Sequence, residues 1–245
     1  MNKYISTIDT NRFGFKIAKV NTFNNNPIEL INELKNQGVK LIISRINVLD
    51  LDLINSLERI GFEMKDVQLS YNINLRSDAN YVEIEKHKFI IRDSKIEDAE
   101  QISDLARQSF KGYGHYSADK RLDYKKSTEV YADWAKNTCL DKNAADKVIV
   151  AEDNGIILAF GSYKILEDSI GKYAKGIIGA VLPEYQKMGF LKIISLKSMD
   201  WAVKNGLKRF QHTVLSTNYG MNSAYTKFGY TLFKSEITFH YWFDN

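Results

Sequence analysis

Several residue types and patterns that mark whole protein classes are scarce or missing in this chain. Its 245 residues include one cysteine, Cys139, which excludes an intramolecular disulfide and is typical of a reducing compartment. No apolar run approaches the roughly 18 residues of a membrane span, and the N-terminal residues lack the apolar segment of a signal peptide. We therefore expect a cytoplasmic protein that does not bind a membrane.

Signatures of several chemistries are missing as well. No group of His, Cys and carboxylate residues has metal-ligand spacing, so we expect no metal site. The chain contains neither the Gly-x-x-x-x-Gly-Lys-Ser/Thr phosphate loop nor the Gly-x-Ser-x-Gly nucleophile turn. It also lacks a basic helix and an RNA-binding aromatic motif, which argues against nucleic acid as a partner. Cys139 has no adjacent base, and we interpret it as a structural thiol.

What is present is the composition of a globular protein with a small excess of positive charge. The hydrophobic fraction is 44%, and the length allows one large domain or two small ones. The formal net charge is +4 and the sequence pI is about 8.8. This charge indicates either a lysine-rich solvated surface or attraction to a polyanionic ligand, such as coenzyme A or a nucleotide sugar.

The first part of the chain predicts a small unit of order β-α-β-α-β-β. Its expected elements are a turn into an alternating strand at 9–20, a helix at 27–37, a strand at 40–46, a helix at 49–60 and one or two strands at 62–75. Residues 77–88 are polar and weakly patterned, and we interpret them as a linker. The predicted domains are therefore residues 1–82 and residues 83–245.

The second part predicts the order β-α-α-β-β-β-α-β-α-β-β. Its expected elements are strand 89–92, helix 97–110, a polar-aromatic stretch 111–124, helix 127–139, strands 147–152 and 156–164, strand 175–182, helix 189–204, strand 208–215, helix 218–228, and strands 230–234 and 237–243. Helix 189–204 is followed by Asn205-Gly206, and helix 218–228 is followed by Gly229. Glycine at these positions is typical of the left-handed residue that ends a helix.

The stretch from Val181 to Lys192 organises this second part. A buried strand stops at Pro183, which cannot donate to a sheet, and a helix starts near Gly189. Such a loop directs successive backbone N–H groups and a helix N-terminus at one point. That point suits a phosphate or pyrophosphate group.

The spacing Gln186-x-x-Gly189-x-Leu191 resembles the Gln/Arg-x-x-Gly-x-Gly/Ala signature of the GNAT superfamily, the acyl-CoA-dependent N-acyltransferases. Leu191 stands where that family has Gly or Ala. The order of elements from residue 89 to 243 is also that of a GNAT domain. The resemblance implies an α/β fold with a mixed sheet and acyl-CoA as co-substrate. The implied pyrophosphate-binding residues are Val181, Leu182, Gln186, Lys187, Met188, Gly189, Phe190, Leu191 and Lys192.

The same resemblance assigns roles to two residues of helix 218–228. Tyr225 lies four residues before Gly229, at the position where GNAT enzymes place a general acid that protonates the coenzyme A sulfur. A tyrosine hydroxyl, with an ordinary pKa near 10, is a reasonable acid for a thiolate. Asn218 matches the residue that often bonds the pantetheine arm. The alternative for Tyr225 is a core aromatic on a helix face.

An internal repeat connects the two parts of the chain. Residues 40–46 and 56–62 match the pattern of residues 208–214 and 224–230, a strand followed by a helix that ends in Gly and an aromatic residue. We interpret the first domain as resembling a partial copy of the second half of a GNAT fold. Leu57 stands where the later copy has Tyr225, so we expect the first copy to be non-catalytic.

The loop between the first two helices of the second part is the expected acceptor site. Its aromatic side chains can stack on a base or sugar, and His115 and Asp119 can bond hydroxyl groups or help to remove a proton. A surface loop fixed by buried tyrosines is the alternative. The expected substrate-binding residues are Tyr113, His115, Tyr116, Asp119, Tyr131 and Trp134.

The opening residues 9–15, the loop 114–119 and residues 130–134 together resemble the two-domain dTDP-fucosamine acetyltransferase group. This implies transfer of an acetyl or other short acyl group to the amine of a dTDP-linked amino-dideoxy sugar. The acyl group would be transferred directly in a ternary complex, and the product would serve surface glycan (lipopolysaccharide) biosynthesis. The resemblance also implies a possible homodimer. The general base is left open between His115, Asp119 and a water chain. Two alternatives remain, a GNAT enzyme that acts on a protein N-terminus, lysine or small amine, and a non-catalytic binding module.

Overall fold

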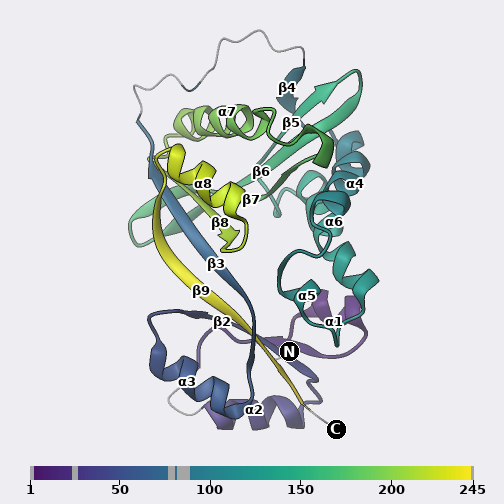
Figure 1. Cartoon of the computed structure of the whole chain (residues 1–245), viewed down its shortest axis with the longest axis vertical. Coiled ribbons are helices and arrows are strands. Elements are labelled where there is room, and N and C mark those ends of the chain that lie inside the picture. Colours follow the sequence, from purple (N-terminus) through teal and green to yellow (C-terminus); the bar gives the residue numbers. More distant parts are fainter. Residues whose placement is uncertain (1–2, 24–26, 77–80, 82–88, 244–245) are drawn as a thin grey trace.

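A computed structural model describes residues 3–23, 27–76, 81 and 89–243 (Figure 1). The strands of these residues form one nine-stranded mixed sheet, in the order β1-β2-β9-β3-β8-β7-β6-β5-β4. The strands are β1 (Ile17–Lys19), β2 (Leu41–Asn47), β3 (Glu63–Asn74), β4 (Ile90–Asp93), β5 (Lys147–Asp153), β6 (Ile156–Asp168), β7 (Gly171–Val181), β8 (Arg209–Leu215) and β9 (Thr231–Trp242). The predicted mixed α/β class is confirmed.

The α-helices of the described residues are α1 (Thr7–Phe13), α2 (Pro27–Asn36), α3 (Leu51–Ile60), α4 (Ala99–Ser109), α5 (Gly114–Ala118), α6 (Tyr124–Leu140), α7 (Phe190–Lys204) and α8 (Tyr219–Lys227). Short 3₁₀ turns, η1 (Ile96–Asp98) and η2 (Pro183–Tyr185), precede α4 and α7. Among the described residues, no helix has both the length and the apolar character that crossing a membrane requires.

Local capping explains where the helices begin and end. The Asp50 side chain accepts a hydrogen bond from the Leu53 N–H at the start of α3, and Gly61 ends that helix with φ 106°. The expected turn into a strand over residues 9–20 is right only for the strand β1 at 17–19, because residues 9–13 lie in α1. Ser6 caps α1 by accepting the Asp9 N–H. A capping serine before a seven-residue helix of about two turns carries little periodic signal, so the sequence pattern missed it.

The strands reveal an exchange between the two repeats. Strands β2 and β8 start at residues 41 and 209, and strands β3 and β9 start at residues 63 and 231, in both cases 168 residues apart. Yet β3 pairs with β8, and β9 pairs with β2. The register is equivalent in both halves, with Leu41 opposite Trp242 and Arg209 opposite Asn74. Six neighbouring strands, in the order β1-β2-β9-β3-β8-β7, therefore have a pseudo-twofold arrangement. Strands β1, β2 and β9 on one side correspond to β7, β8 and β3 on the other.

This exchange changes the expected strand pattern. Residues 230–243 contain one long strand, β9 (Thr231–Trp242), instead of the two predicted strands, and residues 62–75 also contain one strand. Strand β3 lies between β8 and β9 in the middle of the sheet (Figure 1). The predicted linker 77–88 lies almost wholly outside the described residues. A division at residues 82 and 83 stays a prediction, but strands from both sides of it share one sheet.

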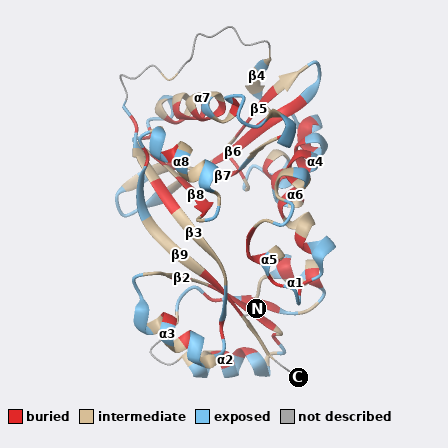
Figure 2. Ribbon diagram, viewed as in Figure 1, coloured by how far each residue is buried: buried red, intermediate tan, exposed pale blue. Residues whose placement is uncertain are grey.

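Three buried clusters hold helices against this sheet. Leu34 of α2 and Leu57 of α3 pack on Ile42 of β2, whereas Tyr116 of α5 packs on Leu41 and its neighbours. Because successive strand residues point to opposite faces, α2 and α3 lie on one face and α5 on the other. The largest cluster joins the sheet from β4 to β8 with α4, α6, α7 and α8, where Figure 2 shows buried residues along β5 and β6.

Candidate functional site

The central feature of the site is an opening between the parallel strands β7 and β8. These strands pair only at Ala174 with Phe210 and at Lys175 with Gln211, although both strands continue beyond those residues. Past these pairs, main-chain groups of the two strands no longer bond to each other. An extended ligand that carries amide groups can therefore occupy the opening and use them.

The side chain of His212 explains why the strands separate at this point. A Cβ at Gly176 of β7 would lie only 2.2 Å from Nδ1 of His212 on β8, so the imidazole rests directly on the glycine. One residue further on, the register of β6 and β7 shifts between Ser162 and Tyr163, which marks a bulge at Ile177. The bulge and the inserted ring together widen the gap between β7 and β8.

The loop after β7 borders this opening. Gly189 has φ 89° immediately before α7, and Lys187 has φ 65°. Phe190 is buried and fixes the first turn of the helix, while Met188 is exposed. The first N–H groups of a helix have no intrahelical acceptor, so this turn presents donors to an anion. The predicted pyrophosphate residues are contiguous here, at the N-terminus of α7.

Asn218 lies across the opening, at the N-terminus of α8. Its Oδ1 accepts the Met221 N–H at 3.2 Å and caps the helix. The hydroxyl of Tyr113 lies beside it and accepts the Leu215 N–H at 3.3 Å. Burial raises the pKa of Tyr113, and hydrogen bonds from Leu215 and Asn218 partly offset that rise. The structure thus brings Asn218, predicted to bind the cofactor, next to Tyr113, predicted to bind the acceptor.

Tyr225 lies at the closed end of the opening, on the face of the sheet that α8 covers. Its ring stacks on His212 at 4.8 Å between centroids and contacts Tyr71 at 5.5 Å. Burial raises the pKa of Tyr225 far above its usual value, so the hydroxyl stays protonated. Burial also lowers the pKa of His212 to about 3, so the imidazole under the tyrosine stays neutral. The pair therefore combines a proton donor with an uncharged neighbour.

Sequence reasoning missed Asn222, which organises this region. Its Nδ2 donates to the main-chain oxygens of Leu215 and Ser216, each at 3.1 Å. Its Oδ1 accepts the Tyr71 hydroxyl at 3.0 Å. Asn222 thereby joins α8 to the end of β8 and to the exchanged strand β3. Asn222 is four residues after Asn218 and three residues before Tyr225, so the three side chains lie on one face of the helix. This spacing is the sequence signal that could have identified Asn222.

The predicted acceptor residues fall into two groups. Tyr113 and Tyr131 form an aromatic cluster with Phe110, in which the centroids of Phe110 and Tyr131 are 5.0 Å apart. Gly114 is required beside them, because a Cβ there would lie 2.1 Å from the Tyr131 hydroxyl oxygen. Trp134 lies beyond Tyr131 and is 43% exposed. This group faces the end of β8 and the opening.

The second group lies deeper and joins α5 to strand β9. Nδ1 of His115 is 2.8 Å from Nε2 of His240, whose Nδ1 is 2.6 Å from a carboxylate oxygen of Asp119. Burial lowers the pKa of His115 well below its usual value. Burial alone would raise the pKa of Asp119, but hydrogen bonds from His240 and Trp242 outweigh it and lower that pKa.

Tyr116 belongs to this second group through a different bond. Its hydroxyl donates to Oδ1 of Asp9 at 2.8 Å, and Asp9 also pairs with Lys19 at 2.6 Å. These contacts bind α5 to α1 and β1. The role of His115, Tyr116 and Asp119 in substrate binding stays a prediction, whereas their structural contacts are direct. His240, which no sequence pattern singled out, is a central member of this network.

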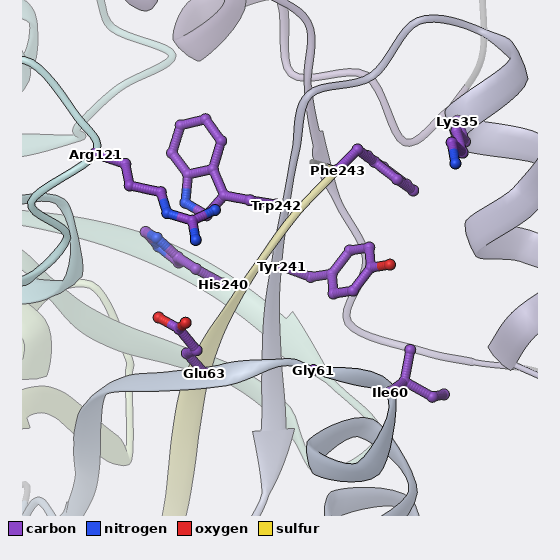
Figure 3. A pocket seen from close by; sticks show the side chains of 9 residues that line it. All are labelled: Lys35, Ile60, Gly61, Glu63, Arg121, His240, Tyr241, Trp242 and Phe243. Carbon is purple, nitrogen blue, oxygen red and sulfur yellow. The ribbon is translucent and has the colours of Figure 1, made fainter. Parts of the chain in front are cut away.

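A separate cavity of about 300 Å³ lies at the far end of β9. Its lining residues are Lys35, Ile60, Gly61, Glu63, Arg121, His240, Tyr241, Trp242 and Phe243. Figure 3 shows Arg121, Trp242 and His240 on one side of β9, with Tyr241 and Lys35 on the other side. The cavity therefore lies around the C-terminal end of β9. It contains none of the residues around the β7–β8 opening, and we do not assign it to the candidate site.

Comparison with known proteins identifies relatives of this arrangement. The profile of the acetyltransferase (GNAT) family matches residues 100–230. A curated relative, the beta-lysine N(6)-acetyltransferase of Methanococcus maripaludis, is 39% identical over 85 residues. Those residues are 34% of this chain and 30% of the relative, so the match spans less than a third of that protein.

Solved structures resemble the chain over most of its length. A tandem GNAT protein from the clavulanic acid biosynthesis pathway aligns with TM-score 0.66 and 10% identity, covering 92% of this chain and 75% of that one. A conserved protein from Staphylococcus epidermidis, described as functionally unknown, aligns with TM-score 0.61 and 16% identity, covering 92% and 83%. At these identities the likeness concerns the fold alone.

Proposed function

The chain belongs to the acetyltransferase (GNAT) family, whose profile covers more than half of its length, and on this premise we propose that it transfers a short acyl group from acyl-CoA to a primary amine. The β7–β8 opening is the observation that carries the proposal. The N-terminus of α7, whose first N–H groups have no intrahelical acceptor and could bind an anion, lies at one end of the opening, and the buried, protonated Tyr225 lies at the other.

Acyl-CoA fits the two ends of this opening. The loop from Val181 to Lys192 would receive the pyrophosphate, with main-chain donors at the start of α7 and the charges of Lys187 and Lys192. The pantetheine arm is extended and carries two amides, so it would bond to the main-chain groups that β7 and β8 leave unpaired. The amide of Asn218 lies beside this path. The thioester would then lie near His212 and Tyr225.

Direct transfer requires few protein groups. The neutral amine attacks the thioester carbon, a C–N bond forms, and the C–S bond breaks as the tetrahedral intermediate collapses. Tyr225 would give its proton to the departing thiolate, and the amine would lose a proton to a base. The oxygens of Asp119 already accept hydrogen bonds from His240, Trp242 and the Arg121 N–H. Nδ1 of His115 is likewise engaged, 2.8 Å from Nε2 of His240, and burial lowers the pKa of His115 well below its usual value. A water chain is therefore the best of the three candidates for the base.

The acceptor is proposed at the level of a small molecule with a primary amine. The sequence resemblance favours a dTDP-linked amino-dideoxy sugar, whereas the curated relative is named for beta-lysine. The aromatic cluster of Tyr113 and Tyr131 at the end of β8 supports an acceptor larger than a simple amine. Both acceptor classes therefore belong in the test.

The experiment is a thiol-release assay with acetyl-CoA and longer acyl-CoA donors. The acceptor panel contains dTDP-amino-dideoxyhexoses, lysine, β-lysine and short peptides with free N-termini. We expect turnover with one acceptor class. Tyr225→Phe should lower kcat by about a hundredfold, with acyl-CoA affinity unchanged. Tyr219→Phe is the matched control, because Tyr219 lies on the same helix and is 78% exposed.

Two results would refute the proposal. One is a protein that binds none of the acyl-CoA donors. The other is a protein that binds them but releases no thiol with any amine, which would favour a non-catalytic binding module. If turnover occurs and Tyr225→Phe retains full kcat, the N-acyltransferase assignment stands and the role of Tyr225 as acid is wrong.

A further inference from the structure

Asp66 in strand β3 is a buried carboxylate that lacks a partner. Both of its carboxylate oxygens are inaccessible to solvent, and neither has a hydrogen-bond partner among the described residues. Buried carboxylates are normally paired with a cation or accept several hydrogen bonds. The pairing of β3 with β9 shifts register between Met64 and Asp66, so a bulge sets the direction of this side chain. The missing partner points to a ligand.

The surroundings of Asp66 place it beside the predicted acceptor loop. A Cβ at Gly114 would lie 3.8 Å from Oδ2 of Asp66 and 2.1 Å from the hydroxyl oxygen of Tyr131. The carboxylate therefore lies under the start of α5, close to the phenol of Tyr131. Burial is the main reason that the pKa values of Tyr113 and Tyr131 are raised, and the charge of Asp66 adds to both rises, which agrees with this placement.

A cation lies on the same face, in the same row across the sheet. Thr238 of β9 is opposite Asp66, and Arg45 of β2 is opposite Thr238. Residues directly opposite each other share one face, so all three point toward α5 and α6. Nε of Arg45 donates to Oγ1 of Thr238 at 3.4 Å, which brings the guanidinium over the intervening strand. The row therefore places a positive and a negative side chain on one face of the sheet, with Thr238 between them.

This row lies at the end of the opening and away from Tyr225. Gln68 pairs with Leu215 at the end of β8, so Asp66 lies two residues, about 7 Å, further along. Tyr71, opposite His212, is five residues from Asp66 along β3, a distance on the order of 15 Å. Asp66 is thus too distant to act on a thioester beside Tyr225. It can hold another part of an acceptor whose amine reaches that thioester.

We propose that Asp66 and Arg45 bind the non-reacting end of an amino-acid acceptor, the ammonium group on Asp66 and the carboxylate on Arg45. This inference rests on the proposed acyl transfer and names its substrate class, a diamino acid with a second, distal amine. An ammonium gives Asp66 the partner that it lacks, and a planar guanidinium can bind a carboxylate in a bidentate manner. A nucleotide diphosphate would meet repulsion from Asp66 in the same place.

The test measures binding without turnover, using free coenzyme A to fill the cofactor site and calorimetry to titrate four probes. Lysine and β-lysine carry both charged groups, 1,5-diaminopentane lacks the carboxylate, and 6-aminohexanoate lacks the second ammonium. Asp66→Asn should weaken lysine and diaminopentane by about ten- to a hundredfold and leave 6-aminohexanoate nearly unchanged. Arg45→Gln should weaken lysine and 6-aminohexanoate and spare diaminopentane.

Glu63→Gln is the matched control, because Glu63 lies on the same strand but is exposed and paired with Lys65. Thermal unfolding separates binding from structure: removal of an unpaired buried charge should not lower the Tm of Asp66→Asn. Unchanged lysine affinity in Asp66→Asn, or equal loss for all four probes, overturns the inference. Tight binding of a dTDP-amino sugar with no binding of lysine also overturns it. Because no turnover is needed, these outcomes are distinct from a failed thiol-release assay.

Discussion

The buried imidazole of His212 should make the stability of this protein depend on pH in a way that one substitution removes. The ring lies on Gly176 and stacks between Phe210 and Tyr225, each at 4.8 Å. Its Nε2 is buried without a hydrogen-bond partner among the described residues. Burial therefore disfavours the charged form, and the pKa falls from 6.5 to about 3.

The sign and the size follow from proton linkage. Between pH 6.5 and 3 the unfolded chain binds a proton at this residue and the folded chain does not, so stability falls as pH falls through that range. Each pH unit changes the free energy of unfolding by about 1.4 kcal/mol for one such group. Between pH 7 and pH 4.5, His212 alone should therefore account for a loss of about 2.5 kcal/mol.

The assay is urea unfolding of the wild type and of His212→Gln at pH 7 and at pH 4.5. The substitution should destabilise the protein at pH 7, because it removes the stacked ring. That deficit should shrink by about 2.5 kcal/mol at pH 4.5, since glutamine does not titrate. The buried His115 contributes a similar slope to both proteins and cancels in the comparison. An equal deficit at the two pH values would refute the reasoning.

Two other features yield direct tests. A fragment that begins at residue 89 lacks β3, which lies between β8 and β9 in the full chain. We expect circular dichroism to show no cooperative unfolding for this fragment, unlike the full chain. A folded fragment that unfolds cooperatively would contradict the exchange. Gly176→Ala places a Cβ 2.2 Å from Nδ1 of His212 and should lower the free energy of unfolding by about 1–3 kcal/mol. Gly220→Ala, in the first turn of α8 with no close side-chain contact, should instead leave stability equal or higher.

Features with a local cause were predictable from the sequence. The helix after Asp50 and the helix after Asn218 carry their own N-cap residues, and glycines follow both. The loop before α7 was also recognisable, because Gly189 adopts φ 89° where few other residues would. These elements depend on neighbours within a few residues, which a sequence pattern records.

The exchange of β3 and β9 was not predictable in this way. Each strand follows a helix that ends in Gly, and each has apolar residues in alternate positions, such as Leu69 and Tyr71 in β3 and Ile237 and Phe239 in β9. Pairing within a repeat or between repeats satisfies the same local pattern. For the same reason Asp66 was missed. The first repeat was expected to be non-catalytic, with a structural or substrate-framing role, and no sequence pattern showed that the exchange brings Asp66 of β3 next to the predicted acceptor loop.

The place of β9 also has a consequence for how the protein is made. Strand β9 (Thr231–Trp242) follows β2 and β3 by more than 150 residues in the sequence, yet it lies between them in the sheet, and both of them are synthesised first. Until β9 emerges from the ribosome, β2 and β3 each keep an edge that has no partner, and such edges invite pairing with other chains. The centre of the sheet can therefore close only after β9 itself has been synthesised. Its long-range pairings should make folding slow and dependent on protection of the nascent chain.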